Sequence, residues 1–107
     1  MTDASKAAQS MAVMTKLFVG RLPVRYEKLN AALALCRANP AAVDNWVELH
    51  RLTQSLAEAA AAFGRDALSE QAGMIDLLLQ DMLAQDARSG ADVDEVARLL
   101  ALLQAST

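Results

Sequence analysis

The chain contains very little cysteine and histidine, the residues that form disulfides and most often bind transition metals. Cys36 is its one cysteine and His50 is its one histidine among 107 residues. A single cysteine cannot form a disulfide within the chain, and these two side chains supply too few ligands for a dedicated metal site. The sequence therefore predicts no metal and no other cofactor. It also predicts that Cys36 is buried as a small apolar side chain within a helix.

Long apolar runs and an excess of basic residues are also absent. No stretch reaches the roughly 18 apolar residues that a membrane-spanning helix needs. The apolar stretch from Met11 to Val19 is interrupted by Thr15 and Lys16, so it does not resemble a signal peptide. The net charge of −3 argues against a nucleic-acid-binding surface. We therefore expect a cytoplasmic protein that binds neither nucleic acid nor a membrane.

Aromatic residues make up only 4% of the chain, whereas 54% of it is hydrophobic. The apolar residues are mostly alanine, leucine, valine and methionine, which favours helices. The five methionines are interpreted as filling the core. Residues 1–64 carry seven Lys/Arg and five Asp/Glu, or +2, and residues 65–107 carry three and eight, or −5. We interpret the acidic part as a solvated face of a single domain, residues 1–107.

Apolar residues recur at helical spacing in five segments. The expected helices cover residues 3–19, 23–38, 40–63 and 66–87, and a fifth begins near Asp92. The expected apolar stripes are Ala8, Met11, Met14 (or Thr15) and Phe18; Tyr26, Leu29, Leu33 and Cys36; Leu49, Leu52, Leu56, Ala59 and Phe63; Leu68, Ala72, Ile75, Leu79 and Met82; and Val96, Leu99 (or Leu100) and Leu103. This pattern predicts an all-α fold, namely an antiparallel four-helix bundle with an additional N-terminal helix.

Turn and capping residues mark the boundaries of these segments. Asn39 is expected to cap the third helix, with Pro40 at its first helical position. Gly64 is expected to end that helix in the left-handed conformation. Asp92, with Glu95 three residues later, resembles a capping box at the start of the fifth helix.

One stretch of the third expected helix carries a motif. It reads Gln54-Ser55-Leu56-Ala57-Glu58-Ala59-Ala60, followed by Phe63-Gly64. This stretch resembles the core motif of histidine phosphotransfer (Hpt) domains, His-Ser-x-x-Gly-Ser/Ala-Ala and then Phe-Gly, without a gap. The likeness extends over residues 17–104. It implies an Hpt-like antiparallel four-helix bundle on which a histidine kinase or a response-regulator receiver domain docks, in a two-component phosphorelay.

Three positions depart from the family motif. Gln54 stands in place of the phosphorylated histidine, and its amide nitrogen is not a nucleophile because the lone pair is delocalised into the carbonyl. Glu58 stands in place of a glycine, where it fills space and repels an acidic receiver site. Ala57 replaces a lysine that is common in the family. The resemblance therefore implies a domain that has lost phosphoryl transfer at this position.

His50 is the remaining candidate for a phosphoacceptor. It lies four residues before Gln54 and so on nearly the same helical face. We interpret it as a flanking, partly packed residue, with a displaced phosphoacceptor as the alternative. Asp76 and Asp81 lie about 140° apart around their helix, so they are not predicted to act as a carboxylate pair.

The expected function is that of a non-phosphorylatable Hpt-like signalling protein that is not an enzyme and has no catalytic residue. It would dock as a monomer on a histidine kinase or a receiver domain and act as an adaptor or inhibitor. The expected docking face consists of His50, Arg51, Gln54, Ala57, Glu58 and Ala61. Two alternatives remain: an active phosphotransfer protein that uses His50, and a helical self-association scaffold unrelated to phosphorelay.

Overall fold

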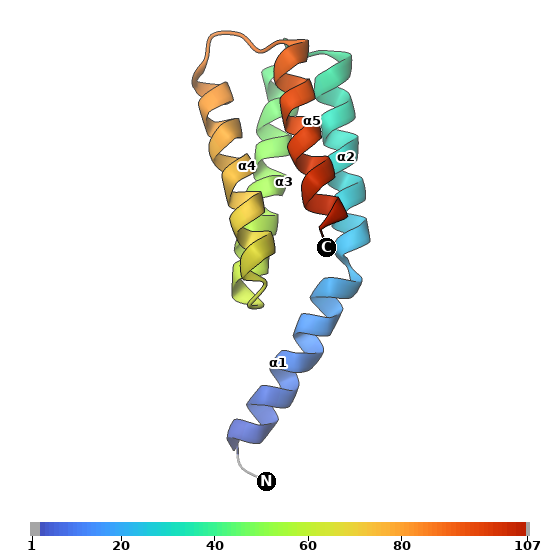
Figure 1. Ribbon diagram of the computed structural model, residues 1–107, viewed down its shortest axis with the longest axis vertical. Coiled ribbons are helices and arrows are strands. Elements are labelled where there is room, and N and C mark those ends of the chain that lie inside the picture. The colour runs from blue at the N-terminus through green and yellow to red at the C-terminus, as the bar shows by residue number, and fades with distance from the viewer. Residues whose placement is uncertain (1–2, 107) are drawn as a thin grey trace.

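The described part of the chain consists of helices joined by turns. The computed structural model describes residues 3–106, and this range contains no strand. The helices are α1 (Asp3–Gly20), α2 (Leu22–Ala38), α3 (Val43–Ala62), α4 (Asp66–Ala84) and α5 (Gly90–Ala105) (Figure 1). The predicted all-helical class is confirmed. Within residues 3–106, none of the helices combines the length and the apolar character needed to cross a membrane.

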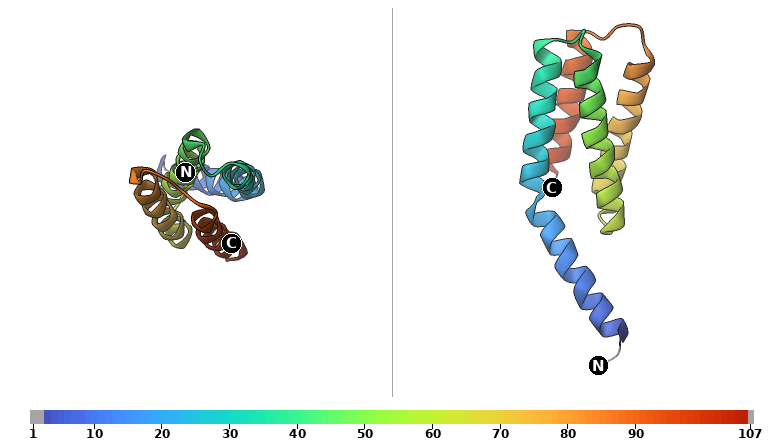
Figure 2. Two further views of the ribbon diagram at one scale, coloured as in Figure 1. Left: turned by 90° about the horizontal axis from the view of Figure 1, so that it is seen from above. Right: turned by 180° about the vertical axis from the view of Figure 1, so that it is seen from behind.

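Helices α2, α3, α4 and α5 lie side by side, whereas α1 extends away from one end of this group (Figure 1). Helix α3 makes its most extensive contacts with α4 and also contacts α2, while α5 contacts both α4 and α2. The α2–α3 and α4–α5 connections lie at one end of the group, and the α3–α4 connection lies at the other (Figure 1). Seen along their axes, the four helices surround a common interior (Figure 2).

The interior is filled mainly by aliphatic side chains from all four helices. The stripe predicted for residues 66–87 is confirmed, because Leu68, Ala72, Ile75, Leu79 and Met82 are all buried. Cys36 is fully buried, as predicted. The largest fully buried side chains include Trp46, Leu29, Leu49, Leu56, Leu100 and Leu103. Each fully buried leucine contributes about 1.5–3 kcal/mol, so these residues are the main source of stability.

The stripes predicted on α2 and α3 differ in part from the observed ones. On α2, Leu29 and Cys36 are buried, but Tyr26 and Leu33 are half-buried and Ala32 is buried instead. The buried residues of α3 are Trp46, Leu49, Thr53, Leu56 and Ala60, whereas Leu52, Ala59 and Phe63 are half-buried. The reason is that α3 packs against both α2 and α4, which centres its buried face between these two neighbours. The small side chain at Ala60 leaves room for this close packing.

The apolar face predicted for the first helix is mostly uncovered. Phe18 is buried, but Ala8, Met11 and Met14 are exposed because α1 leaves the group of four helices. The interpretation of the methionines as core residues is correspondingly wrong for Met11, Met14 and Met74, which are exposed. Met82 is buried, and Met1 lies outside the described residues.

The third helix begins later than predicted. Asn39 caps the end of α2 through its backbone N–H, which donates to the Leu35 carbonyl at 3.1 Å, and it does not cap α3. Pro40 lies in the turn that follows, and its carbonyl accepts a 2.9 Å hydrogen bond from the Trp46 indole. Because buried Trp46 needs a partner for its N–H, this bond holds Pro40 outside the helix. Ala42 is the N-cap of α3.

The connection between α4 and α5 also differs from the prediction. Helix α4 ends at Ala84, three residues early, because Arg88 donates to the carbonyls of Met82 and Gln85 at 3.2 and 3.0 Å. The N-cap of α5 is Ser89 and not Asp92. Ser89 and Asp92 form the capping box, in which the Asp92 carboxylate accepts from the Ser89 backbone N–H at 2.8 Å.

Gly64 ends α3 as predicted. It has a φ of 70°, the left-handed conformation that favours glycine. The Arg65 N–H donates to the Ala60 carbonyl at 2.8 Å, and the Gly64 N–H donates to the Ala61 carbonyl at 3.2 Å. These two bonds form a Schellman motif, which satisfies carbonyls at the helix end and turns the chain directly into α4.

Candidate functional site

The Hpt-like motif lies in the C-terminal half of α3, and part of it faces solvent. Arg51, Gln54, Glu58 and Ala61 are all exposed. Their spacings of three, four and three residues put them on one side of the helix, and we call this set the Gln54 stripe. The two positions that depart most from the Hpt motif, Gln54 and Glu58, therefore lie next to each other on an open surface.

Other residues of the motif are part of the packing. Leu56 and Ala60 are fully buried between α3 and its neighbours. Phe63 stacks on Phe18 of α1, with ring centroids 5.2 Å apart and an angle of 22° between the ring planes. The Phe-Gly end of the motif thus fixes both the turn into α4 and the point where α1 joins the other helices.

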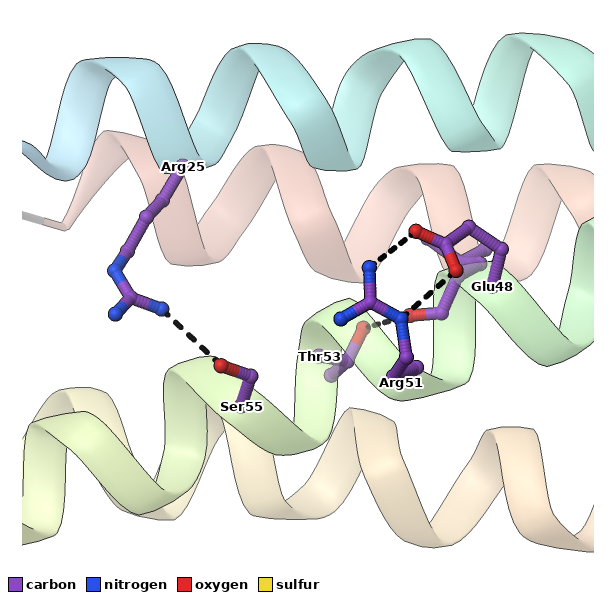
Figure 3. Close-up of polar contacts among 6 residues, drawn as sticks. Arg25, Glu48, Arg51, Thr53 and Ser55 are labelled. Atoms are coloured by element: carbon purple, nitrogen blue, oxygen red, sulfur yellow. Dashed lines mark hydrogen bonds and ion pairs between the residues drawn. The ribbon is translucent and has the colours of Figure 1, made fainter.

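Ser55 faces α2 and is joined to it by a polar contact. Arg25 of α2 donates from Nη1 to the Ser55 Oγ at 3.4 Å (Figure 3). The same guanidinium lies over the Phe18 ring, 5.6 Å from its centroid. A cation above an aromatic face is attracted to the ring electrons, so Arg25 connects α1, α2 and α3 beside the motif.

Arg51 is oriented by a carboxylate on its own helix. Its Nε and Nη2 donate to the two Glu48 oxygens at 2.9 and 2.5 Å, a bidentate pair (Figure 3). The hydrogen bonds from Arg51 hold the pKa of Glu48 below its usual value, and Glu48 in turn raises the pKa of Arg51. Both side chains are exposed, so the pair mainly fixes the direction of Arg51 and contributes little to stability.

His50 is turned away from the Gln54 stripe, toward α4. Its side chain is 20% exposed, and its Nε2 lies 2.5 Å from Oδ1 of Asp76, whose side chain is 15% exposed. The two atoms are at ion-pair distance but not aligned as a hydrogen bond, and neither has another hydrogen-bond partner among the described residues. Gln80 donates to the other Asp76 oxygen at 3.3 Å. The interpretation of His50 as partly packed is therefore confirmed.

Ala57 also faces α4. It is half-buried, and its carbonyl accepts a 3.0 Å hydrogen bond from the Ser69 hydroxyl. The six residues expected to form one docking face are consequently divided. Arg51, Gln54, Glu58 and Ala61 form the exposed Gln54 stripe, while His50 and Ala57 lie at its edge, against α4.

A groove borders the Gln54 stripe on the side of α2. It has a volume of about 800 Å³ and lies between α2 and α3, with Arg51 and Ser55 on its α3 wall. Val24 and Leu35 of α2 are also in the lining and are 52% and 56% exposed. The open side of α3 therefore continues into a surface that offers apolar contacts.

The side chains at this site are suited to binding rather than to covalent chemistry. The exposed stripe holds an amide, a carboxylate, a guanidinium and a methyl group, none of which is an activated nucleophile. In the described part of the chain, no three His, Cys, Asp or Glu side chains converge on a possible metal position. Sequence reasoning missed Asp76 as the neighbour of His50, because nothing in the spacing of either residue indicates how two helices are rotated against each other.

Comparison with known proteins gives no relative for this chain. A scan against protein-family models, a search of curated proteins and a search of solved structures each found no match.

Proposed function

We propose that this chain is an Hpt-like signalling protein that docks without carrying phosphoryl. In this proposal α2 to α5 form the antiparallel four-helix bundle of that family, and α1 is an additional N-terminal helix. The partner is a histidine kinase or a receiver domain in a two-component phosphorelay, and the protein acts as an adaptor or inhibitor by occupying its docking surface. The observation that carries the proposal is the joint exposure of Gln54 and Glu58 on α3.

The chemistry of these two side chains supports docking without transfer. Gln54 is exposed where the resembling motif has its histidine, but an amide only donates and accepts hydrogen bonds. Glu58 is exposed one turn later and adds a negative charge beside it. An acidic receiver site would repel this carboxylate unless the receiver holds its own metal cation. Binding would therefore depend on whether that cation is present in the partner.

The surroundings of Gln54 support a protein partner. The small side chain of Ala61 leaves space for a partner at one end of the Gln54 stripe. At the other end, hydrogen bonds to Glu48 fix the direction of the Arg51 side chain. The groove beside Arg51 and Ser55 adds apolar surface from Val24 and Leu35. A polar stripe next to an apolar groove has the mixed composition of a protein–protein interface.

The proposal is tested by capture of partners from the native cell with tagged protein. The wild type is compared with Gln54→Arg/Glu58→Arg, which makes the neutral Gln54 stripe strongly basic, and with Gln85→Arg/Glu95→Arg. The second variant is the matched control, because Gln85 and Glu95 are also exposed but lie directly after α4 and on α5, away from α3. We expect the wild type and the control to recover a sensor kinase or a receiver protein, and the stripe variant to lose it.

Two results would contradict the proposal. If the stripe variant recovered the same two-component protein as the wild type, the docking face would be wrong. If none of the three proteins recovered a two-component protein, the self-association scaffold would become the better explanation of the helices. The other alternative, phosphotransfer by His50, takes second place because Nε2 faces the Asp76 carboxylate at 2.5 Å.

A further inference from the structure

Among the described residues, exposed large apolar side chains occur on every helix, but α1 carries the most of them and α4 carries the two most exposed. Helices α1 and α4 do not contact each other. Met74 and Leu77 of α4 are 69% and 65% exposed, the highest values among the large apolar residues described. On α1, Val13 and Leu17 are 59% and 53% exposed. Exposed apolar residues that cluster in this way mark a surface that another surface covers.

The two helices also carry opposite charge. Helix α1 contains Lys6 and Lys16 against one acidic residue, Asp3, and Arg21 follows it directly. Helix α4 contains four acidic residues (Asp66, Glu70, Asp76 and Asp81) and no Lys or Arg. In a chain with a net charge of only −3, this separation makes α1 and α4 electrostatically complementary.

On α4 the apolar pair lies between two carboxylates. Glu70, Met74, Leu77 and Asp81 follow at spacings of four, three and four residues, so they share one face, and all four are exposed. We call this set the α4 stripe. Its two acidic ends are separated by 11 residues, or about 16 Å along the helix.

On α1 the apolar pair lies beside basic residues. Val13 and Leu17 are one turn apart, with Lys16 beside them and Arg21 one turn beyond Leu17. These four residues and Gly20 line a hollow of about 550 Å³. We call Val13, Lys16, Leu17 and Arg21 the arm surface. The arm surface thus combines two apolar and two basic side chains, and the α4 stripe combines two apolar and two acidic ones.

Within one copy these two surfaces do not meet. Helix α1 extends away from the other helices and meets α2 only near the point where the two helices join (Figures 1 and 2). Near this end, Phe18 stacks on Phe63. The α4 stripe faces outward from the same group of helices. We propose that the arm surface of one copy docks on the α4 stripe of a second copy, and that the contact is made twice in a two-fold dimer. This departs from the monomer expected from the sequence, where Met11, Met14 and Phe18 were assigned to an intramolecular face.

The dimer is tested by sedimentation velocity on the full chain over a wide range of concentration. Variant one, Lys16→Glu/Arg21→Glu, makes the arm surface acidic, and variant two, Glu70→Lys/Asp81→Lys, makes the α4 stripe basic. We expect a reversible dimer for the wild type that weakens as salt is added. Each variant alone should shift the midpoint of dimerisation to a concentration at least about a hundredfold higher, because like charges then face each other.

The decisive sample is an equal mixture of the two variants. In a dimer of one copy of each, the acidic arm surface of variant one meets the basic α4 stripe of variant two. The native basic arm surface of variant two meets the native acidic α4 stripe of variant one, so both contacts of the dimer are restored. We expect the mixture to regain the dimer, which no folding defect of either variant could produce. Glu27→Lys/Glu95→Lys is the matched control, since it makes the same change in charge at exposed positions on α2 and α5. It should dimerise like the wild type.

A further variant tests the apolar part of the contact without changing any charge. Met74→Ser/Leu77→Ser changes two side chains that are mostly exposed, so it should fold and remain a monomer. A wild type that is monomeric at every concentration would overturn the proposal, and so would a mixture that stays monomeric while both variants are folded by circular dichroism. Larger open assemblies would overturn the two-fold arrangement. Gln54 and Glu58 belong to neither surface, so this outcome does not depend on the proposed docking function.

Discussion

His50 on α3 and Asp76 on α4 face each other across the most extensive helix contact of the fold, with Nε2 and Oδ1 2.5 Å apart. Both side chains are mostly shielded from water, and neither of these two atoms has a hydrogen-bond partner among the described residues. If the imidazole is removed, the Asp76 oxygen that faces it keeps the cost of desolvation without the compensation.

The first prediction is a coupling between these two residues. We expect His50→Ala and Asp76→Ala each to lower the free energy of unfolding by about 1–3 kcal/mol. The double variant should lose less than the sum of the two, with a coupling of about 1 kcal/mol, measured by urea denaturation. Asp81 is exposed on the same helix, so the cycle of His50→Ala with Asp81→Ala should give no coupling. Equal values in both cycles would show that the 2.5 Å contact contributes nothing.

The second prediction concerns the motif itself. Gln54→His/Ala57→Lys/Glu58→Gly restores the residues of the Hpt pattern at the positions that depart from it. We expect this variant to accept an acid-labile phosphoryl group from a phosphorylated receiver or kinase, and the wild type not to accept it. The introduced glycine costs about 1 kcal/mol in a helix, which the fold should tolerate.

The control for this experiment keeps the other two changes. Gln54→Ala/Ala57→Lys/Glu58→Gly should take up no label, because it lacks the imidazole. Label on the control, or none on a folded restored variant with any phosphorylated donor, would limit the Hpt resemblance to sequence and fold.

The third prediction compares two glycines by the conformations they adopt. Gly64 has a φ of 70°, so Gly64→Ala should lower the free energy of unfolding by about 1–2 kcal/mol. Gly73 lies inside α4, where an added Cβ meets no atom within 4 Å. Gly73→Ala should therefore raise the free energy of unfolding by about 1 kcal/mol, since alanine favours the helix. Thermal unfolding checks both values, and a shift of the same sign for both would contradict the argument.

The fourth prediction follows from the burial of Cys36. Burial raises the pKa of this thiol from 9.0 to about 11, against a smaller opposing effect of a backbone hydrogen bond. At pH 8 the folded protein should react with iodoacetamide at least about a hundredfold more slowly than the unfolded chain, because so little thiolate is present. Mass spectrometry after timed alkylation measures this ratio, and equal rates would contradict it.

The same pKa shift fixes the sign of a pH effect. Between pH 9.0 and about 11 the unfolded chain loses the Cys36 proton that the folded chain keeps. The contribution of this group to stability is therefore complete below pH 9.0 and is lost as pH rises through about 11. Cys36→Ala should lack this part of the loss of stability at alkaline pH. As a check, this variant should not be alkylated by iodoacetamide. An identical pH dependence of both proteins would argue against the shift.

The sequence predicted those features of the fold that depend only on the spacing of residues within one helix. The buried face of α4, formed by Leu68, Ala72, Ile75, Leu79 and Met82, was predicted completely, because its spacings of four, three, four and three keep these residues on one side of the helix. Gly64 was also predictable, since a glycine after an alanine-rich helix has few other roles. These features are fixed by neighbours within one helix.

Other features depended on competition or on distant partners. Ser89–Asp92 and Asp92–Glu95 are overlapping capping pairs with the same spacing, and only the folded connection selects the first. The late start of α3 depends on the bond between Trp46 and the Pro40 carbonyl. At the candidate site, the exposure of Gln54 and Glu58 followed from the helical period, but the partner of His50 is set by the rotation of α3 against α4.

The Schellman turn at Gly64 also has a consequence for how the chain folds. It joins α3 and α4 through a very short connection, and these two helices make the most extensive contacts in the molecule. Closing so short a loop costs little chain entropy, so this helical hairpin is the pair whose contacts form most readily. We expect it to be the nucleus onto which α2 and α5 add. Substitutions at the α3–α4 contact should then slow refolding, while those on α5 should mainly speed unfolding.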